Sequence, residues 1–213
     1  MPAKKDSLYE HLSPLSVTMK QRLVEWFSGD ALDTDRWNTN NNSGTNTFAM
    51  VDGLDNGFKI TTQAASSAHG SITFDNIRQY AHNGSECIGV LKRNTGSVRS
   101  YMGLSNNANA TSTAFQMAIV EDRTALANKG VSSSNGSSFT NTSSSPAIPI
   151  DTAWTGYKLA LDGTDIKLYI NGVLGVTKST TNPTVNMQPI VGARNEASTA
   201  GETQVRYLEA YNT

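Results

Sequence analysis

Apolar and polar side chains alternate through residues 154–176 with the period of two that is typical of half-buried β-strands. Turn residues interrupt the pattern at Asp162 and Gly163. They do so again at Asn171 and Gly172, a pair that tolerates the positive φ angles of a tight type I′ hairpin. The alternating apolar residues are Tyr157, Leu159, Leu161, Ile166, Leu168 and Ile170. The stretch therefore predicts two successive hairpins of an antiparallel sheet.

Short runs of the same kind recur along most of the chain, with turn residues between them. Residues 23–27 read either as a helix end or as a first strand, and the β-formers Val24 and Trp26 favour the strand. The other predicted strands are residues 48–51, 57–62, 70–74, 86–92, 98–104, 115–121, 154–161, 166–171, 173–176, 187–192 and 203–211. Many short strands without a convincing interior helix predict an all-β fold, a two-sheet antiparallel β-sandwich or jelly roll.

The strand pattern covers residues 21–213, which we take as one domain, and three other segments differ from it. Residues 1–20 form an N-terminal arm that is expected to dock on the domain or on a neighbouring subunit. Residues 38–47, rich in amides, are expected to be a loop. The Ser- and Asn-rich residues 132–145 are expected to be an exposed low-complexity loop. The apolar arm residues that would dock are Leu8, Tyr9, Leu12, Leu15 and Met19.

Composition excludes several functional classes. Charged residues make up 16% of the chain, below the ~25% usual for soluble domains, so amides and hydroxyls carry much of the solubility. A net charge of −1 without basic clusters argues against nucleic-acid binding, and no apolar run approaches the length of a membrane span. The N-terminus is too polar for a signal peptide, which predicts folding in the cytoplasm. The single cysteine, Cys87, lies in an apolar run and is predicted to be a core residue.

Two segments carry a resemblance to a known family. In residues 154–172, Trp154 and Tyr157 open a strand, an Asp-Gly turn follows, and a strand ending in Tyr-x-Asn-Gly completes the hairpin. Residues 27–37 run from a strand-ending Phe to Leu-Asp-x-x-x-Trp. These motifs resemble laminin-G-like members of the concanavalin A-like lectin/glucanase superfamily. The resemblance implies a jelly roll in which the last strand pairs beside the first.

Glucanases of this superfamily carry Glu-x-Asp-x-Glu on one strand, which places two carboxylates on one face beside the glycosidic bond. No predicted strand of this sequence carries that motif. Glu121 and Asp122 are adjacent, so their side chains are expected to point to opposite faces of a strand. His11, His69 and His82 lack a cysteine or carboxylate at metal-ligand spacing. We therefore expect no enzyme activity, no metal site and no cofactor.

Two hypotheses about function remain. The first is a non-enzymatic virion structural protein, because similar jelly rolls occur in tailed bacteriophages as capsid decorations or fibres. The expected arm and the absence of a signal peptide fit this hypothesis. It predicts a homo-oligomer located in the virion, with the major capsid protein or tail components as partners, and the sequence favours it.

The second hypothesis is a carbohydrate-binding module, in which aromatic rings stack on sugar rings and nearby amides bind hydroxyl groups. The two hypotheses overlap, since a virion protein can also bind glycans. The candidate sugar-binding residues are Trp37, Tyr101, Asn106, Trp154 and Tyr169. For Trp37 and Trp154 the alternative, which the family resemblance favours, is that both rings anchor the core.

Overall fold

The computed structural model describes residues 22–53, 56–74, 78–95, 97–110, 113–123 and 128–213. The predicted arm lies outside these ranges, and so do its residues Leu8, Tyr9, Leu12, Leu15 and Met19. The arm, the homo-oligomer and the virion partners therefore stay predictions. No helix among the described residues is long and apolar enough to cross a membrane.

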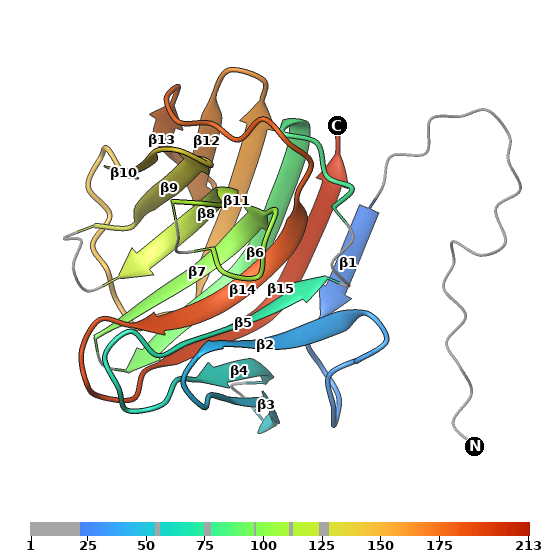
Figure 1. The fold of residues 1–213 in the computed structure, drawn as a ribbon, viewed down its shortest axis with the longest axis vertical. Helices are drawn as coiled ribbons and strands as arrows, with labels where there is room; N and C mark the ends of the chain where they lie inside the picture. Colours follow the sequence, from blue (N-terminus) through green and yellow to red (C-terminus); the bar gives the residue numbers. More distant parts are fainter. Residues whose placement is uncertain (1–21, 54–55, 75–77, 96, 111–112, 124–127) are drawn as a thin grey trace, which may run out of the picture.

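The described residues form two antiparallel sheets that stack as layers (Figure 1). The eight-stranded sheet contains, in order, β13 (Val173–Lys178), β12 (Ile166–Ile170), β11 (Thr155–Asp162), β6 (Asn83–Thr95), β15 (Glu202–Asn212), β4 (Gly57–Thr61) and β3 (Thr47–Val51), with β1 (Arg22–Trp26) paired to β15. The seven-stranded sheet contains β10 (Phe139–Ser143), β9 (Gly130–Asn135), β8 (Gln116–Arg123), β7 (Val98–Ser105), β14 (Gln188–Asn195), β5 (His69–Phe74) and β2 (Trp37–Ser43). This architecture confirms the predicted two-sheet sandwich.

The hairpins predicted in residues 154–176 are confirmed. β11 pairs with β12, and β12 pairs with β13. Asn171 and Gly172 both adopt positive φ angles, 48° and 82°, as the type I′ turn requires. The last strand, β15, pairs with the first strand, β1, as the family resemblance implied.

Aromatic side chains anchor the core between the sheets. The Trp37 ring is 1% exposed and lies 5.4 Å from the Phe27 ring and 5.6 Å from the Phe74 ring, centroid to centroid. Its indole Nε1 donates a hydrogen bond to Glu25 (3.1 Å), so the polar edge of the ring is satisfied. Cys87 is fully buried in the same core, which confirms its predicted role.

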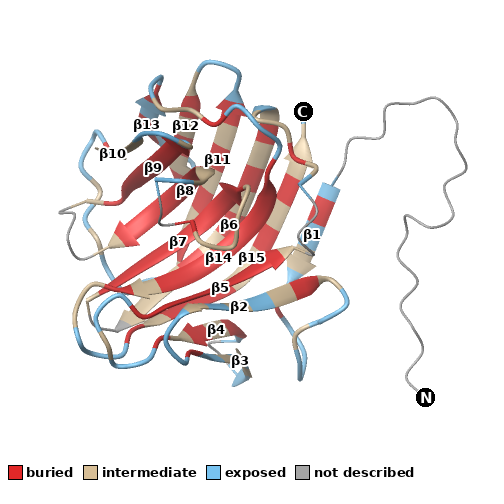
Figure 2. Ribbon diagram, in the orientation of Figure 1, coloured by how far each residue is buried: buried red, intermediate tan, exposed pale blue. Residues whose placement is uncertain are grey.

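The two sheets differ in how they are covered (Figure 2). β11 and β12 alternate buried and partly exposed residues, as expected of a sheet with one face in solvent. β7 is buried along its whole length and β14 along nearly all of it. A second apolar cluster, separate from the main core, therefore lies on the outer face of the seven-stranded sheet, the face turned away from the core. Its buried members are Tyr101, Ala110, Met117, Ile119 and Ile190.

Part of this outer face is covered by the connection between β7 and β8. Ala110 of that connection packs in the outer cluster. The Ala108 carbonyl accepts hydrogen bonds from Asn42 Nδ2 (3.0 Å) and Ser71 Oγ (2.8 Å). These bonds attach the connection to β2 and β5.

The prediction of a loop at residues 38–47 is wrong for most of its length, since β2 occupies Trp37–Ser43. The amide side chains explain why such a polar segment pairs as a strand. Asn40 Nδ2 donates to Thr73 Oγ1 at 3.1 Å, and Asn42 Nδ2 donates to Ser71 Oγ at 3.0 Å. Side-chain hydrogen bonds to β5 thus replace apolar packing on this edge strand.

The prediction of an exposed loop at residues 132–145 is also wrong, because β9 and β10 form a hairpin there. Ser132, Ser133 and Ser134 are fully buried. The hydroxyl of Ser133 donates to the Thr180 carbonyl (3.3 Å), and that of Ser134 donates to the Thr113 carbonyl (3.2 Å). A serine small enough to fit and able to bond to backbone oxygen can be buried in a strand at low cost.

Tyr101 crosses the outer face and links three strands. Its Cα pairs with Gly192 of β14, where an added Cβ would lie 2.1 Å from the phenol oxygen, so the ring occupies the space of a side chain. The phenol oxygen and His69 Nε2 of β5 form a hydrogen bond. Burial lowers the pKa of His69 to about 3, and the charges of Arg194 and Arg99 add to the effect. The imidazole is therefore neutral at neutral pH.

Replacing Gly192 with alanine is expected to destabilise the protein, because the new methyl group would displace the Tyr101 ring and separate it from His69. The expected loss is ~1–3 kcal/mol of unfolding free energy, measured by urea denaturation. Gly156→Ala is the matched control, since the nearest atom to its added Cβ would be Asn171 Oδ1 at 3.5 Å, an ordinary contact. Equal stability of the two variants would contradict the account.

Stability is expected to fall as the pH decreases from about 6.5 toward 3. The unfolded His69 takes up a proton near pH 6.5, whereas the folded one does so only near pH 3. The free energy of unfolding should therefore fall by ~1.4 kcal/mol per pH unit within this window. Urea denaturation at pH 7 and pH 5 measures the effect. His69→Gln keeps a hydrogen-bonding group but does not titrate, so a variant with the same pH slope as the wild type would refute this assignment.

Candidate functional site

Four basic residues form one row across adjacent strands of the seven-stranded sheet. Arg123 of β8 pairs with Arg99 of β7, Arg99 pairs with Arg194 of β14, and Arg194 pairs with His69 of β5. Directly opposed residues on neighbouring strands project from the same face. Arg99 lies two positions before Tyr101, so the row shares the outer face with the Tyr101 ring.

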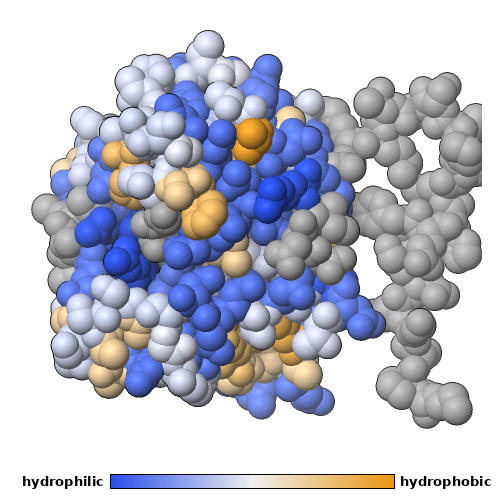
Figure 3. All heavy atoms as spheres, viewed as in Figure 1, coloured by the Kyte–Doolittle hydropathy of each residue, from blue (hydrophilic) through white to orange (hydrophobic). Residues whose placement is uncertain are grey.

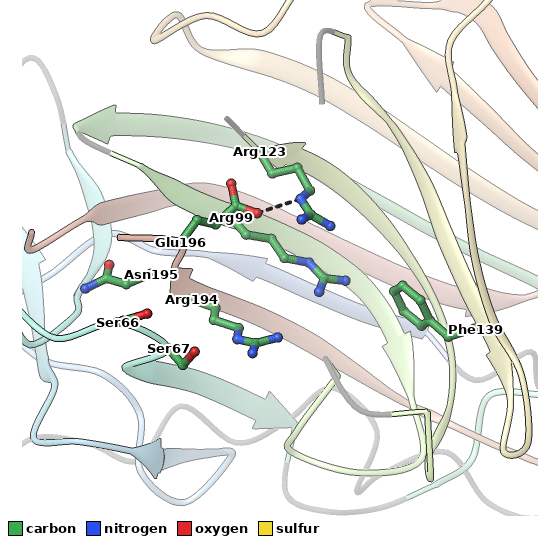
Figure 4. A pocket seen from close by; sticks show the side chains of 8 residues that line it. All are labelled: Ser66, Ser67, Arg99, Arg123, Phe139, Arg194, Asn195 and Glu196. Atoms are coloured by element: carbon green, nitrogen blue, oxygen red, sulfur yellow. Dashed lines mark ion pairs between the residues drawn. The ribbon is translucent and has the colours of Figure 1, made fainter. Parts of the chain in front are cut away.

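Two carboxylates partly neutralise this row. Glu121, two positions before Arg123 on β8, is fully buried and forms ion pairs with Arg99 and with Arg123 (3.8 Å). Arg123 Nε also lies 2.7 Å from Glu196 Oε1 (Figure 4). Within the described residues Arg194 has no ion pair. Three guanidinium groups therefore share two carboxylates, which leaves an excess of one positive charge.

Arg99 lies in a buried site beside other positive charges. Burial, then the charge of Arg123, lower the pKa of Arg99 to about 9, so the group stays charged at neutral pH. Its guanidinium carbon lies 5.4 Å from the centre of the Phe139 ring, a cation–π contact that adds to the ion pair with Glu121. These contacts fix the Arg99 side chain in place.

The arginines line a pocket of about 460 Å³ on this face (Figure 4). Arg99 and Arg194 extend side by side in the same direction, toward the side where Phe139 of β10 lies. We call this site the arginine pocket; its other lining residues are Ser66, Ser67, Asn195 and Glu196.

Asn195 supports the serine side of the pocket. Its side-chain amide donates to the carbonyls of Gln63 (2.6 Å) and Ala65 (3.2 Å), and its backbone carbonyl accepts from Ser67 N–H (3.2 Å). The exposed hydroxyls of Ser66 and Ser67 are thus carried on a tethered segment. The pocket combines charged donors, free hydroxyls and one aromatic ring, a set that binds a polar and anionic ligand.

The structure corrects two of the predicted sugar-binding residues. Trp37 lies in the core, and Tyr101 is fully buried against Gly192 and His69. Neither ring is accessible to a sugar, because each fills space that packing requires.

The other three predicted residues lie apart from the pocket. Asn106 Oδ1 accepts a hydrogen bond from the backbone N–H of Gln116 (3.0 Å), which links the start of β8 to the turn after β7. Trp154 is half-buried, with the Arg206 guanidinium carbon 4.2 Å from its ring centre. Tyr169, also half-buried, belongs to β12 of the other sheet. The five candidates therefore do not form one site.

Sequence reasoning missed Arg99, Arg123 and Arg194. A usable signal was present, since each arginine falls within or just beyond a predicted strand, 98–104, 115–121 or 187–192, where a charge needs a partner. Only the register of the strands shows that the three lie in one row. Within the described ranges, no three His, Cys, Asp or Glu side chains gather as metal ligands would.

A scan against protein-family models and a search of curated proteins each gave no match to this sequence. Solved structures do match. A β-glucanase of Bacillus licheniformis has a TM-score of 0.63 at 12% identity, over 90% of this chain and 98% of the other. A pseudo β-1,3-glucanase and immunostimulatory antigen of Mycobacterium tuberculosis has a TM-score of 0.62 at 11% identity, with the same coverage. The metal-free carbohydrate recognition domain of Emp46p has a TM-score of 0.55 at 11% identity, over 83% of this chain and 88% of the other.

These matches overturn the prediction of a non-enzymatic virion component. The three similar structures are those of a β-glucanase, a pseudo β-1,3-glucanase and a carbohydrate recognition domain, and none of them is a capsid or tail protein. Identities of 11–12% show a common fold only. The chain has the concanavalin A-like jelly-roll fold that the sequence motifs indicated.

Proposed function

We propose that the protein binds a glycan in the arginine pocket. The observation that carries the proposal is the pocket itself, which lies on a sheet face that the β7–β8 connection covers in part. The fold shared with glucanases and with a carbohydrate recognition domain supports a saccharide as the ligand. A volume of about 460 Å³ is within the ~300–1,000 Å³ typical of small-ligand sites.

The pocket offers the groups that a saccharide needs. Ser66 and Ser67 present exposed hydroxyls for sugar hydroxyls, and the partly exposed Phe139 ring offers an apolar surface for the face of a pyranose. The surface in the view of Figure 3 is mainly hydrophilic, with apolar side chains in small separate patches. Such a surface suits a hydroxyl-rich ligand better than an apolar partner.

Several side chains that line the pocket are held in place before any ligand binds. Arg99 is held by Glu121 and Phe139, Arg123 by Glu196, and the serine segment by Asn195. Little side-chain entropy is then lost on binding, which favours affinity for a ligand of matching shape.

Filling the pocket is expected to weaken glycan binding. Ser66→Trp places a large ring in the pocket from an exposed position, so affinity measured on a glycan array and by calorimetry should fall at least ~10-fold. Ser179→Trp is the control, because Ser179 is exposed after β13 and does not line the pocket. A blank array with folded wild-type protein, or equal binding by both variants, would contradict the proposal.

Glycan cleavage is a second candidate function. The observation in its favour is that two carboxylates, Glu121 and Glu196, contact Arg123, and that one of them, Glu196, lines the pocket. Hydrolysis of a glycosidic bond usually requires two carboxyl groups that flank it. Glu121 is fully enclosed by its ion pairs, whereas Glu196 is partly exposed and lines the pocket, so Glu196 is the carboxylate that a bound saccharide would meet.

If the protein cleaves glycans, Glu196→Gln is expected to remove the activity while glycan binding remains. A carboxamide keeps the shape of the side chain but cannot act as a general acid or base, so the rate should fall at least ~100-fold. Release of reducing ends from the bound glycan measures the rate, and calorimetry measures binding. Full activity in Glu196→Gln would exclude this carboxylate from catalysis.

A further inference from the structure

We infer that the glycan bound in the arginine pocket is acidic and that its carboxylate or sulfate group lies between Arg99 and Arg194. The inference rests on the proposed glycan binding and adds the chemical class of the ligand. It follows from the register of the sheet, the uneven pairing of its charges and the direction of the two side chains.

The register places like charges directly opposite one another. Arg99 is the cross-strand partner of both Arg123 and Arg194. Opposed like charges destabilise a sheet unless counter-charges neutralise them. Glu121 forms ion pairs with Arg99 and Arg123, and Glu196 forms one with Arg123. No carboxylate among the described residues forms an ion pair with Arg194. The row is therefore one negative charge short at the Arg194 side of the pocket.

The histidine at the end of the row does not change this balance. His69, opposite Arg194, is neutral at neutral pH because burial lowers its pKa to about 3. Its Nε2 is already engaged by the hydroxyl of Tyr101. The excess positive charge thus belongs to the guanidinium groups, and only an anion from outside the described residues can balance it.

The two side chains are placed to share one anion. Arg99 and Arg194 project from opposed positions and extend side by side into the pocket (Figure 4). Each guanidinium presents a planar fork of N–H donors that matches the oxygen atoms of a carboxylate or sulfate. Arg99 is 4% exposed and is fixed by Glu121 and Phe139, so an anion in the pocket meets one buried, fixed guanidinium group and one half-buried guanidinium group.

A neutral sugar fits this charge pattern less well. It would cover the half-buried Arg194 guanidinium without supplying a counter-charge, and covering an unpaired charge is costly. An acidic sugar would cover the same guanidinium group but would also accept a charge-assisted hydrogen bond from it, and such a bond is stronger than one between neutral groups. Ser66, Ser67 and Phe139 remain available for the hydroxyls and the ring of the same sugar residue.

The test measures affinity by calorimetry for matched oligosaccharides that are neutral, uronate-containing or sulfated, with inorganic sulfate as a fourth ligand. We expect at least one acidic oligosaccharide to bind ~10-fold or more tightly than its neutral counterpart, with an affinity that falls as salt is added. Preference for the uronate assigns a carboxylate as the bound group, preference for the sulfated chain assigns a sulfate ester, and equal preference supports the anion shared by both.

Arg194→Gln is expected to remove this preference and to leave the weaker neutral binding in place, while Arg194→Lys keeps part of the preference because the charge remains. Arg78→Gln is the control. Arg78 is exposed and follows the Phe74 end of β5, whereas His69 is at the other end of this strand. It removes the same charge outside the pocket, so its preference should match that of the wild type. Thermal unfolding of each variant verifies that it is folded.

Equal affinity for neutral and acidic oligosaccharides, or an unchanged preference in Arg194→Gln, would overturn the inference and leave glycan binding standing. Inorganic sulfate that binds as tightly as the acidic oligosaccharide would also overturn it, because the pocket would then recognise an ion alone. Failure of every oligosaccharide to bind folded protein would refute the proposed function itself.

Discussion

The outer face of the seven-stranded sheet depends on the ion pairs that the buried carboxylate of Glu121 forms with two arginines. Arg99 and Arg123 are directly opposed on β7 and β8, and Glu121 contacts both of them. Removing one partner of such a buried network typically destabilises a protein by ~3–5 kcal/mol, because the remaining charge stays desolvated. The register of β7, β8 and β14 is thereby specified by charge as well as by apolar packing.

This charge network also divides the outer face of the seven-stranded sheet in two. Toward one end, Met117, Ile119 and Ile190 form an apolar cluster that Ala110 of the β7–β8 connection covers. At the arginine row the face stays open and becomes the pocket. The Tyr101 ring lies between the two regions, above Gly192. The fold thus supplies a rigid floor, and the connections between strands decide which part of it a ligand can reach.

Much of the fold was predictable from the sequence, and the site was not. Period-two alternation identified β11 and β12, because in these strands the apolar side chains are buried and the polar ones are not. β2 and β9 were not predicted, because hydrogen bonds from Asn and Ser side chains hold these strands to other segments. A hydropathy pattern does not reveal such bonds.

The site escaped prediction for a different reason. Arg99, Arg123 and Arg194 come from three strands, and only strand register makes them neighbours. Trp37 and Tyr101 are both buried, because a large aromatic side chain in a sandwich contributes to packing. The core role that the resemblance favoured for Trp37 is therefore correct, and the sugar-binding role is wrong for both residues. The family resemblance gave the correct fold, whereas the virion role inferred beyond it is wrong, since one fold hosts many activities.

The most direct measurement is a crystal structure with an acidic oligosaccharide bound. The account predicts the carboxylate or sulfate between the guanidinium groups of Arg99 and Arg194, with the sugar ring against Phe139. A saccharide bound instead on the outer face of the eight-stranded sheet, in the hollow lined by Tyr169 and Tyr207, would contradict it.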